Sequence, residues 1–439
     1  MAASGDPRRD ILLGLLRVAL DGVDGRRCTS RALSARVLSG RALCGDARRA
    51  RSGDAPVWAV AIGKAASRMA LGAHDALGAA LERTLIITKD GHADAEAIAL
   101  PGVEIRECGH PVPDRRSLDA GARLLEFLDE MPAAAWPVFL VSGGASSLVE
   151  VLAPGVSLAA LRALNEAGLA GGSPIDELNA QRRRLSRIKG GQLASLVKGR
   201  RALALLMSDV PHNDPAVIGS GLLGPAPPGA EPLDSSAAGG SRPAGIPRGS
   251  RSGAAADDVE RIVVASLDDA LGAVRARVAG LPALVETERF CGAVSRLAVR
   301  FAHEIALGPA ELRAWGGEST LELPREPGCG GRNQHLALAA ARLIAGRDDL
   351  LLLAAGTDGT DGPTADAGAL VDGGTCGRVA AAGLDVDDCL RRADSSTALA
   401  AAGDLVHTGP TGTNVGDLVI GVKLPKATAR AWLRARPEP

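Results

Sequence analysis

The sequence predicts an α/β protein with two domains, on three observations. The chain has 439 residues, which is more than one ordinary hydrophobic core supports. Short apolar runs alternate with segments of helical periodicity along the first half, as in parallel βαβ units. A stretch rich in Gly, Pro, Ser and Ala at 223–256 then interrupts the pattern, and a second set of strands and helices follows it.

The elements of the first half can be assigned in chain order. Apolar residues at helical spacing predict a first helix over 11–20. Short apolar runs predict strands over 58–62, 85–88, 137–141 and 202–207. Helical periodicity between these runs predicts helices over 65–77, 118–128, 158–169 and the basic stretch 178–197.

The rest of the chain supplies the second domain. We interpret 223–256 as a flexible segment, with an ordered loop as the alternative. After it we expect a strand over 261–265 and helices over 267–278 and 292–305. From about Ala310 we expect strands over 320–323, 350–354 and 418–422 and a helix over 334–344. We therefore assign 1–222 and 257–309 to an N-terminal domain and 310–425 to a C-terminal domain.

Composition excludes several classes of function. Aromatic residues are 2% of the chain and Tyr is absent, which argues against binding nucleic acid by base stacking. The formal net charge of -1 provides no basic field for nucleic acid or membrane. The 7 cysteines are scattered without a CxxC pair, which favours free thiols over a disulfide framework or zinc. With no long apolar run and no signal-peptide pattern, we expect a cytoplasmic protein, a monomer or homodimer, without a membrane partner.

The loop after the strand 137–141 is the first candidate anion site. It combines glycines with hydroxyl side chains, namely Ser142, Gly143, Gly144, Ser146 and Ser147. A loop that leaves a strand to open a helix directs N–H and O–H donors at one point, which suits a phosphate or carboxylate. A tight turn without a ligand is the alternative.

Two further segments of the first domain carry cations. Lys64 follows the strand 58–62 at the start of a helix, where it could place its charge over phosphates, although the full P-loop pattern is absent. A solvated lysine is the alternative. In the basic stretch, helical spacing would put four polar residues on one anion-binding face: Asn179, Arg182, Ser186 and Lys189. A solvated charged face is the alternative there.

Carboxylates follow two of the expected strands. Asp209 and Asp214 come after the strand 202–207, and Asp358 and Asp361 come after the strand 350–354. Ligands of α/β sheets lie beyond the carboxyl ends of strands, so these side chains are candidates for Mg²⁺ binding or for accepting a proton. Turns stabilised by aspartate are the alternative.

The second domain adds glycine-rich and hydroxyl-rich loops. Arg332 lies where the helix 334–344 begins and could clamp an oxyanion. Backbone and side-chain donors or acceptors around it are expected from Gly317, Glu318, Asn333, Thr411, Thr413 and Asn414. Phosphate-type loops, cations and carboxylates are together what phosphoryl transfer requires.

Other catalytic patterns are absent or misplaced. The sequence has no GxSxG elbow and no HExxH. One GxGxxG string spans 219–224, but it runs into prolines rather than into a helix, so the context of a dinucleotide site is missing.

At this point the chain resembles a known family, the glycerate 2-kinases that join an N-terminal DUF4147 domain to a C-terminal MOFRL domain. The resemblance spans nearly the whole chain except about 223–260. Its motifs occur in the family's order, at 63–66, 109–114, 142–144, 179–191, 208–215, 316–318, 330–334, 356–364 and 408–414.

The resemblance implies a fold and an activity. It implies a Rossmann-like large N-terminal domain, a smaller α/β C-terminal domain and a site in the cleft between them. It further implies ATP-dependent phosphorylation of D-glycerate at its 2-hydroxyl, giving 2-phosphoglycerate and ADP. Lys64 and Arg332 match the family's positively charged functional residues and would neutralise phosphate charge. From the residues themselves, Asp209, Asp214, Asp358 and Asp361 are the candidates for Mg²⁺ binding, and Asp209 and Asp358 are also candidates for accepting the proton of the substrate hydroxyl; the sequence does not assign these two roles.

The sequence departs from the family's pattern at several positions. Alanine stands at Ala145 where the family usually has a third glycine, and Leu222 replaces a usual proline. If position 145 requires a positive φ, Ala145→Gly should raise activity. Two other functions stay open: a hydroxypyruvate reductase that uses NAD(P)H, and a relative that binds a metabolite without catalysis.

Overall fold

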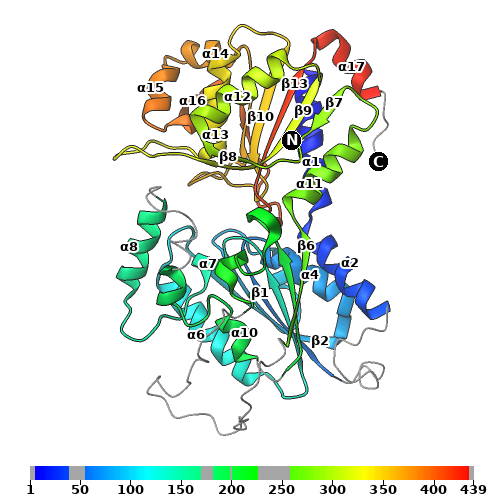
Figure 1. The fold of residues 1–439 in the computed structure, drawn as a ribbon, viewed down its shortest axis with the longest axis vertical. Helices are drawn as coiled ribbons and strands as arrows, with labels where there is room; N and C mark the ends of the chain where they lie inside the picture. Colours follow the sequence, from blue (N-terminus) through cyan, green and yellow to red (C-terminus); the bar gives the residue numbers. More distant parts are fainter. Residues whose placement is uncertain (1–4, 39–54, 170–180, 198–199, 226–257, 435–439) are drawn as a thin grey trace. The chain divides into compact units, whose positions relative to one another are not determined.

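The computed structural model describes residues 5–38, 55–169, 181–197, 200–225 and 258–434 (Figure 1). The chain forms two compact units. The first unit is Gly25–Val264, and the second combines Met1–Asp24 with Ala265–Pro439. Each unit is built around its own β-sheet. In the described residues, no helix has the length and apolar character that a membrane crossing requires.

The first unit holds a six-stranded sheet in the order β3-β2-β1-β4-β5-β6. Its strands are β1 (Val57–Ile62), β2 (Leu81–Lys89), β3 (Val103–Cys108), β4 (Trp136–Val141), β5 (Ala202–Met207) and β6 (Val259–Ala265). The pairings from β3 through β5 are parallel. Every residue of β1, β4 and β5 is buried, as expected for central strands with both faces covered.

Helices pack against this sheet and fix its core. Alternate residues of β1, Trp58 and Val60, contribute to one cluster with Leu124 and Phe127 of α6 (Arg115–Glu130). The helix α4 (Ala66–Leu77) packs against β1 and β2, and α2 (Gly25–Leu38) packs against α4. The remaining helices are short or peripheral: α5 (Ala95–Ile98), α7 (Ala145–Leu148), α8 (Leu158–Leu169) and α10 (Gln192–Leu196).

The second unit is built on a mixed sheet in the order β12-β11-β10-β13-β9-β7, with β8 also pairing with β9. Its strands are β7 (Ala283–Val285), β8 (Phe290–Ala293), β9 (Leu312–Thr320), β10 (Leu350–Gly356), β11 (Gly368–Asp372), β12 (Leu405–Val406) and β13 (Asp417–Lys423). The strands from β12 to β9 run antiparallel to their neighbours, whereas β7 and β8 run parallel to β9.

Helices lie on both faces of the second sheet. Trp315 of β9 packs with Phe301 of α12 (Val294–Leu307), and the next residue, Gly316, faces Leu267 of α11 (Leu267–Arg277) on the other side. The helix α1 (Pro7–Gly22) packs against α11 and α17 (Lys426–Arg434), as Figure 1 shows. The other helices are α13 (Arg332–Leu343), α14 (Thr375–Ala381), α15 (Val386–Arg391) and α16 (Ser395–Ala402).

The predicted fold class is confirmed, and most predicted strands coincide with observed ones. The strand predicted over 320–323 is wrong, because β9 runs from Leu312 and ends at Thr320. The apolar pattern did not predict β9 because Gly316 and Gly317 interrupt its apolar residues. A Cβ at Gly316 would lie 2.9 Å from the Leu267 side chain, and one at Gly317 would lie 2.1 Å from the Phe290 carbonyl oxygen. Close packing from other elements therefore replaces the side chains that mark a strand.

The structure divides the chain differently from the sequence-based domain assignment. The helices α1, α11 and α12, all assigned above to the N-terminal domain, lie in the second unit. Their partners explain this, since α1 packs on α11 and α12 packs on β9 and β13. Arg8 of α1 also donates a 3.2 Å hydrogen bond to the Leu424 carbonyl. Nearly all of the segment 223–256 lies outside the described residues, so its predicted flexibility stays a prediction.

Candidate active site

The strand order of the first unit reverses between β1 and β4. The chain proceeds from β1 toward β3 on one side and from β4 toward β6 on the other. In open α/β sheets of this order, ligands bind beyond the carboxyl ends of the strands at that reversal. Lys64 follows β1 and the 142–147 loop follows β4, so the sheet brings these two predicted segments together.

The two loops interlock through their backbones. The Lys64 N–H donates to the Gly143 carbonyl oxygen at 3.0 Å, and the Ala65 N–H donates to Ser142 Oγ at 3.0 Å. Gly63 makes this approach possible. Its φ is +126°, and a Cβ there would lie 2.2 Å from Ser142 Oγ. Lys64 is thus held in a fixed place beside the glycine-rich loop.

The aliphatic part of the Lys64 side chain lies beside Gly144. A Cβ at Gly144, whose φ is +87°, would lie 3.1 Å from Lys64 Cγ and 3.3 Å from the His110 imidazole. His110 therefore belongs to this cluster. The sequence analysis missed it as a candidate site residue, although the motif at 109–114 that contains it is one of those that carry the family resemblance. Ser147 Oγ donates to the Gly144 carbonyl at 3.2 Å, so this hydroxyl supports the turn. Ser146 lies half-buried in the same loop.

Ala145 does not have the conformation that its glycine neighbour has. It is the first residue of α7 and is completely buried, whereas the positive φ belongs to Gly144. Its Cβ packs close to Gly219. Removing that Cβ would leave a gap and raise the flexibility of the helix, so the structure gives no reason for Ala145→Gly to increase activity.

The loop after β5 reaches the same edge of the sheet. Asp209 is half-buried there, while Asp214 is exposed and its Oδ1 accepts the Ala216 N–H at 2.9 Å. Asp214 thus stabilises a local turn. His212 and Asn213 have φ values of 62° and 54°, which shape the loop between the two aspartates.

The predicted helix over 178–197 is wrong. Helix is described over 181–185, and the chain then turns, with positive φ at Gly190 and Gly191, before α10 begins. The predicted four-residue face is therefore not formed, and Asn179 lies outside the described residues.

The other three residues of that set are bonded inside the protein. Lys189 Nζ lies 2.5 Å from Glu150 Oε2, and both side chains are 0% exposed. Ser186 Oγ donates to the other Glu150 oxygen at 2.5 Å. Arg182 donates to Asn165 Oδ1 at 2.7 Å. Burial lowers the pKa of Lys189, and the Glu150 carboxylate opposes that shift.

A second cluster forms in the second unit, where β9 and β10 end and β13 begins. In the sheet register, Asp417 of β13 lies opposite Gly356 of β10 on one side and opposite Gly317 of β9 on the other. Sequence reasoning missed Asp417, although its position directly after the 408–414 loop and at the start of a strand was a usable signal. Its carboxylate is buried, and its nearest cation is Arg332.

Arg332 bridges two carboxylates at the start of α13. One guanidinium nitrogen lies 2.5 Å from Glu318 Oε1, and another lies 3.4 Å from Asp417 Oδ2. Burial disfavours the Arg332 charge, but Asp417 and Glu318 outweigh burial and raise the pKa of Arg332. Burial raises the pKa of Asp417 to about 6, and Arg332 limits that rise. The Arg332 side chain is 39% exposed, so the guanidinium can also meet a ligand.

Asp361 is the acceptor at the N-terminus of α13. Its two oxygens accept the N–H groups of Asn333 at 3.2 Å and of Gln334 at 2.7 Å. Gly331 permits the approach, since a Cβ there would lie 2.2 Å from Asp361 Cγ. The protein's own carboxylate therefore takes the anion position of this helix, and Arg332 must meet a ligand through its side chain.

The environment of Asp361 predicts a pH dependence of stability. Burial raises its pKa from 3.8 to about 7, although the Gln334 N–H opposes the rise. When folding raises the pKa of a carboxyl group, its neutral form stabilises the folded state fully at a pH below the ordinary pKa. This stabilisation is lost as pH rises from that value through the folded-state pKa of about 7. Wild type should thus lose stability relative to Asp361→Asn between about pH 4 and about pH 7, as measured by urea unfolding.

A matched control isolates the effect of burial. Asp385 caps α15 through the Asp388 N–H, but its side chain is exposed. Asp385→Asn should therefore follow the wild-type pH profile. If the profiles of wild type and Asp361→Asn run parallel, burial does not shift the Asp361 carboxyl as stated.

The remaining predicted residues of the second unit line the adjoining loops. Asp358 is buried and accepts the N–H and the hydroxyl of Thr360, both at 3.1 Å. Thr411 Oγ1 donates to the Thr357 carbonyl at 2.5 Å, which ties the two loops together. Thr413 and Asn414 are buried in the same loop.

The described residues do not form a resident metal site. In neither unit do three or more carboxylate, imidazole or thiol groups of the described residues gather as metal ligands. Asp214 and Asp361 are already bonded to backbone N–H groups. The magnesium ligands predicted from the sequence therefore do not form one resident site within the described part of either unit.

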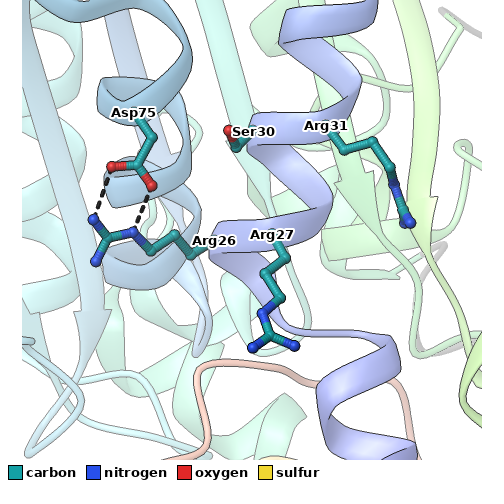
Figure 2. A pocket seen from close by; sticks show the side chains of 5 residues that line it. All are labelled: Arg26, Arg27, Ser30, Arg31 and Asp75. Carbon is teal, nitrogen blue, oxygen red and sulfur yellow. Dashed lines mark hydrogen bonds and ion pairs between the residues drawn. The ribbon is translucent and has the colours of Figure 1, made fainter. Parts of the chain in front are cut away.

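A cavity of about 550 Å³ opens beside α2, away from the predicted residues. It is lined by Arg26, Arg27, Ser30, Arg31 and Asp75, as Figure 2 shows. Asp75 accepts two hydrogen bonds from Arg26, at 2.5 and 2.8 Å. The side chains of Arg27 and Arg31 point in different directions, so these arginines do not converge on one anion. This cavity therefore does not offer a converging site for an anion.

Comparisons with known proteins match nearly the whole chain. The model of a domain of unknown function, DUF4147, matches residues 11–234, and that of the MOFRL family matches residues 312–417. D-glycerate 2-kinase from Thermotoga maritima is 36% identical over 390 residues, covering 83% of this chain and 89% of that protein. A protein from Agrobacterium vitis that is provisionally named as a hydroxypyruvate reductase is 34% identical, covering 76% of this chain and 90% of that protein.

A solved structure is similar to this chain over most of its length. The crystal structure of glycerate kinase from Thermotoga maritima matches with a TM-score of 0.71 and 31% identity. The match covers 94% of this chain and 99% of that one.

Proposed function

Because the chain belongs to the glycerate kinase family that combines DUF4147 and MOFRL domains, we propose that it phosphorylates D-glycerate at the 2-hydroxyl with ATP. The products are 2-phosphoglycerate and ADP. The observation that carries the proposal is Lys64 beside Gly144, at the point where the strand order of the first sheet reverses. A phosphate bound there would meet a cation and a glycine-rich loop, which are the usual means of holding a transferring group.

Each cluster receives a role in this reaction. Lys64 and Arg332 neutralise phosphate charge as it develops in the transition state. Ser146 and the N–H groups of the 142–147 loop bind phosphate or the glycerate carboxylate. Thr413 and Asn414 bind whichever of these two groups, phosphate or the glycerate carboxylate, the 142–147 loop does not bind. Asp209 and Asp358 accept the hydroxyl proton or bind the Mg²⁺ that enters with ATP, so Mg²⁺ is part of the substrate.

The local structure around the GxGxxG string argues against a reductase. Gly221 is buried, and its carbonyl oxygen accepts the Gly191 N–H at 2.6 Å, so this segment packs against a turn of the chain. In a dinucleotide-binding sheet the glycine-rich turn follows the first strand. Here that turn reads Gly63-Lys64-Ala65-Ala66, with one glycine.

The decisive experiment is an assay with ATP, Mg²⁺ and D-glycerate, with NMR used to identify the product. We expect 2-phosphoglycerate and ADP in equal amounts. Formation of 3-phosphoglycerate would overturn the regiochemistry. Oxidation of NADH by hydroxypyruvate without coupling enzymes would support the reductase instead. Calorimetric binding of glycerate without any phosphoryl transfer would favour the non-catalytic relative.

A further inference from the structure

The pair formed by Glu150 and Lys189 differs from every other ion pair between described residues. Both of its side chains are 0% exposed, whereas each other pair keeps at least one side chain in partial contact with solvent. Removing two charges from water is costly, and a buried pair often adds no net stability over an apolar one. A role in positioning other groups is therefore a better reason for the pair than stability.

Glu150 is fixed to the segment that carries the loop after β4. It comes two residues after α7, whose N-cap is Gly144. Its N–H donates to the Ser117 carbonyl at 3.0 Å, which attaches it to α6. A Cβ at Gly121 would lie 1.9 Å from the Glu150 carbonyl oxygen, so α6 approaches it closely. A displacement of the Glu150 side chain would therefore be transmitted to the end of α7.

Lys189 is fixed to the segment that follows the loop after β5. The next two residues, Gly190 and Gly191, donate their N–H groups to the carbonyls of Ser220 and Gly221 at 3.0 and 2.6 Å. The residue before Ser220 is Gly219, where a Cβ would lie 3.3 Å from Ala145 Cβ. The ion pair thus closes a ring of contacts that runs around α7.

Ser186 completes the arrangement. Its hydroxyl donates to Glu150 Oε1 and accepts the N–H of Lys189 at 3.2 Å, while Val151 N–H donates to the same carboxylate at 2.9 Å. The carboxylate thus accepts three hydrogen bonds, counting the one from Lys189 Nζ, and has one fixed orientation.

We propose that the buried Glu150–Lys189 pair is a positioning device that sets the 142–147 loop relative to Lys64. This inference rests on the proposed function, because it assigns the loop a phosphate to hold. Neither charged group reaches substrate, since both are completely buried. The pair acts through α7 and through the contacts of Gly219 on Ala145. Lys189 and Ser186 therefore affect the reaction without being phosphate ligands.

The test separates positioning from stability with three variants. Lys189→Met leaves the Glu150 charge unpaired and should lower the unfolding temperature strongly. Glu150→Gln/Lys189→Met removes both charges and should recover most of that temperature, because no buried charge is left alone. A displaced loop should nevertheless keep kcat about ten- to a hundredfold below wild type, with a raised KM for ATP. Glu150→Asp keeps both charges but shortens the carboxylate arm, and should lower kcat as well.

The control variant is Arg313→Met in the second unit. Arg313 pairs with Glu304 at 3.1 Å, and both side chains are largely buried. Its loss should lower the unfolding temperature while kcat and the KM for ATP of the folded enzyme stay at wild-type values. If the wild type is active and the double variant has the same kcat and KM for ATP as the wild type, the positioning role is overturned. A wild type without kinase activity would instead overturn the proposed function, and calorimetric ATP affinities of the same variants would then decide on positioning.

Discussion

A Lys64→Met variant is expected to lose turnover by about two to three orders of magnitude while keeping its fold. The backbone N–H of Lys64 donates a hydrogen bond to the Gly143 carbonyl, and methionine retains it. The aliphatic stem beside Gly144 is also retained. What disappears is a positive charge at the reversal of the strand order, where the phosphate of the proposed reaction is held.

The measurement is kcat and the KM for ATP and for D-glycerate, with the unfolding temperature as a check on the fold. Lys426→Met removes an exposed lysine of α17 and should leave the kinetics unchanged. A Lys64→Met enzyme with the wild-type kcat would show that its charge does not act in the transition state. A raised KM at constant kcat would limit Lys64 to ground-state binding.

An Arg332→Met variant is expected to show a comparable loss of turnover and, unlike Lys64→Met, a loss of stability that grows with pH. Arg332 is the nearest cation to the buried Asp417, and its charge holds down the pKa that burial raises to about 6. Without Arg332 the folded-state pKa should rise further. The stability contributed by the neutral carboxyl is then lost as pH rises from about 4 through that higher value.

Three further variants separate the effect of Arg332 on turnover from its effect on stability. Arg332→Met/Asp417→Asn should regain stability at alkaline pH without regaining turnover, since the unpaired carboxylate is gone but the cation is still missing. Arg332→Lys keeps the charge without the planar guanidinium fork and should recover only part of the turnover. Arg342→Met removes an exposed arginine of the same helix as a control. Full recovery of turnover in the double variant would mean that Arg332 serves only to neutralise Asp417.

The parts of the molecule that the sequence predicted are those set by local pattern. The strands β1, β4 and β5 are buried on both faces, so each appears as an uninterrupted apolar run. Ser142 directly follows β4, and Lys64 follows β1 after one glycine; because β1 and β4 are parallel neighbours, the two residues lie close together. The same reasoning failed for β9, where packing from Leu267 and Phe290 requires glycines within the strand.

The parts that the sequence did not predict depend on contacts between distant residues. Asp361 looks like a metal ligand in a loop of aspartates, but it caps a helix that begins 29 residues earlier, at Arg332. Lys189 looks like part of a basic helical face, yet Glu150 pairs with it inside the protein. A carboxylate or an ammonium has several possible partners, and only the tertiary structure decides which of them is near.

The position of α1 affects how this protein can be synthesised and dissected. Because α1 belongs to the second unit, the first unit is inserted into the second along the chain. During translation, α1 emerges before α11 and α17, so its packing partners do not exist until those helices have been made. A fragment that begins at Ala265 would lack this helix and the hydrogen bond from Arg8 to Leu424. The second unit is therefore better produced with α1 joined by a short linker to the segment that begins at Ala265 than as that C-terminal segment alone.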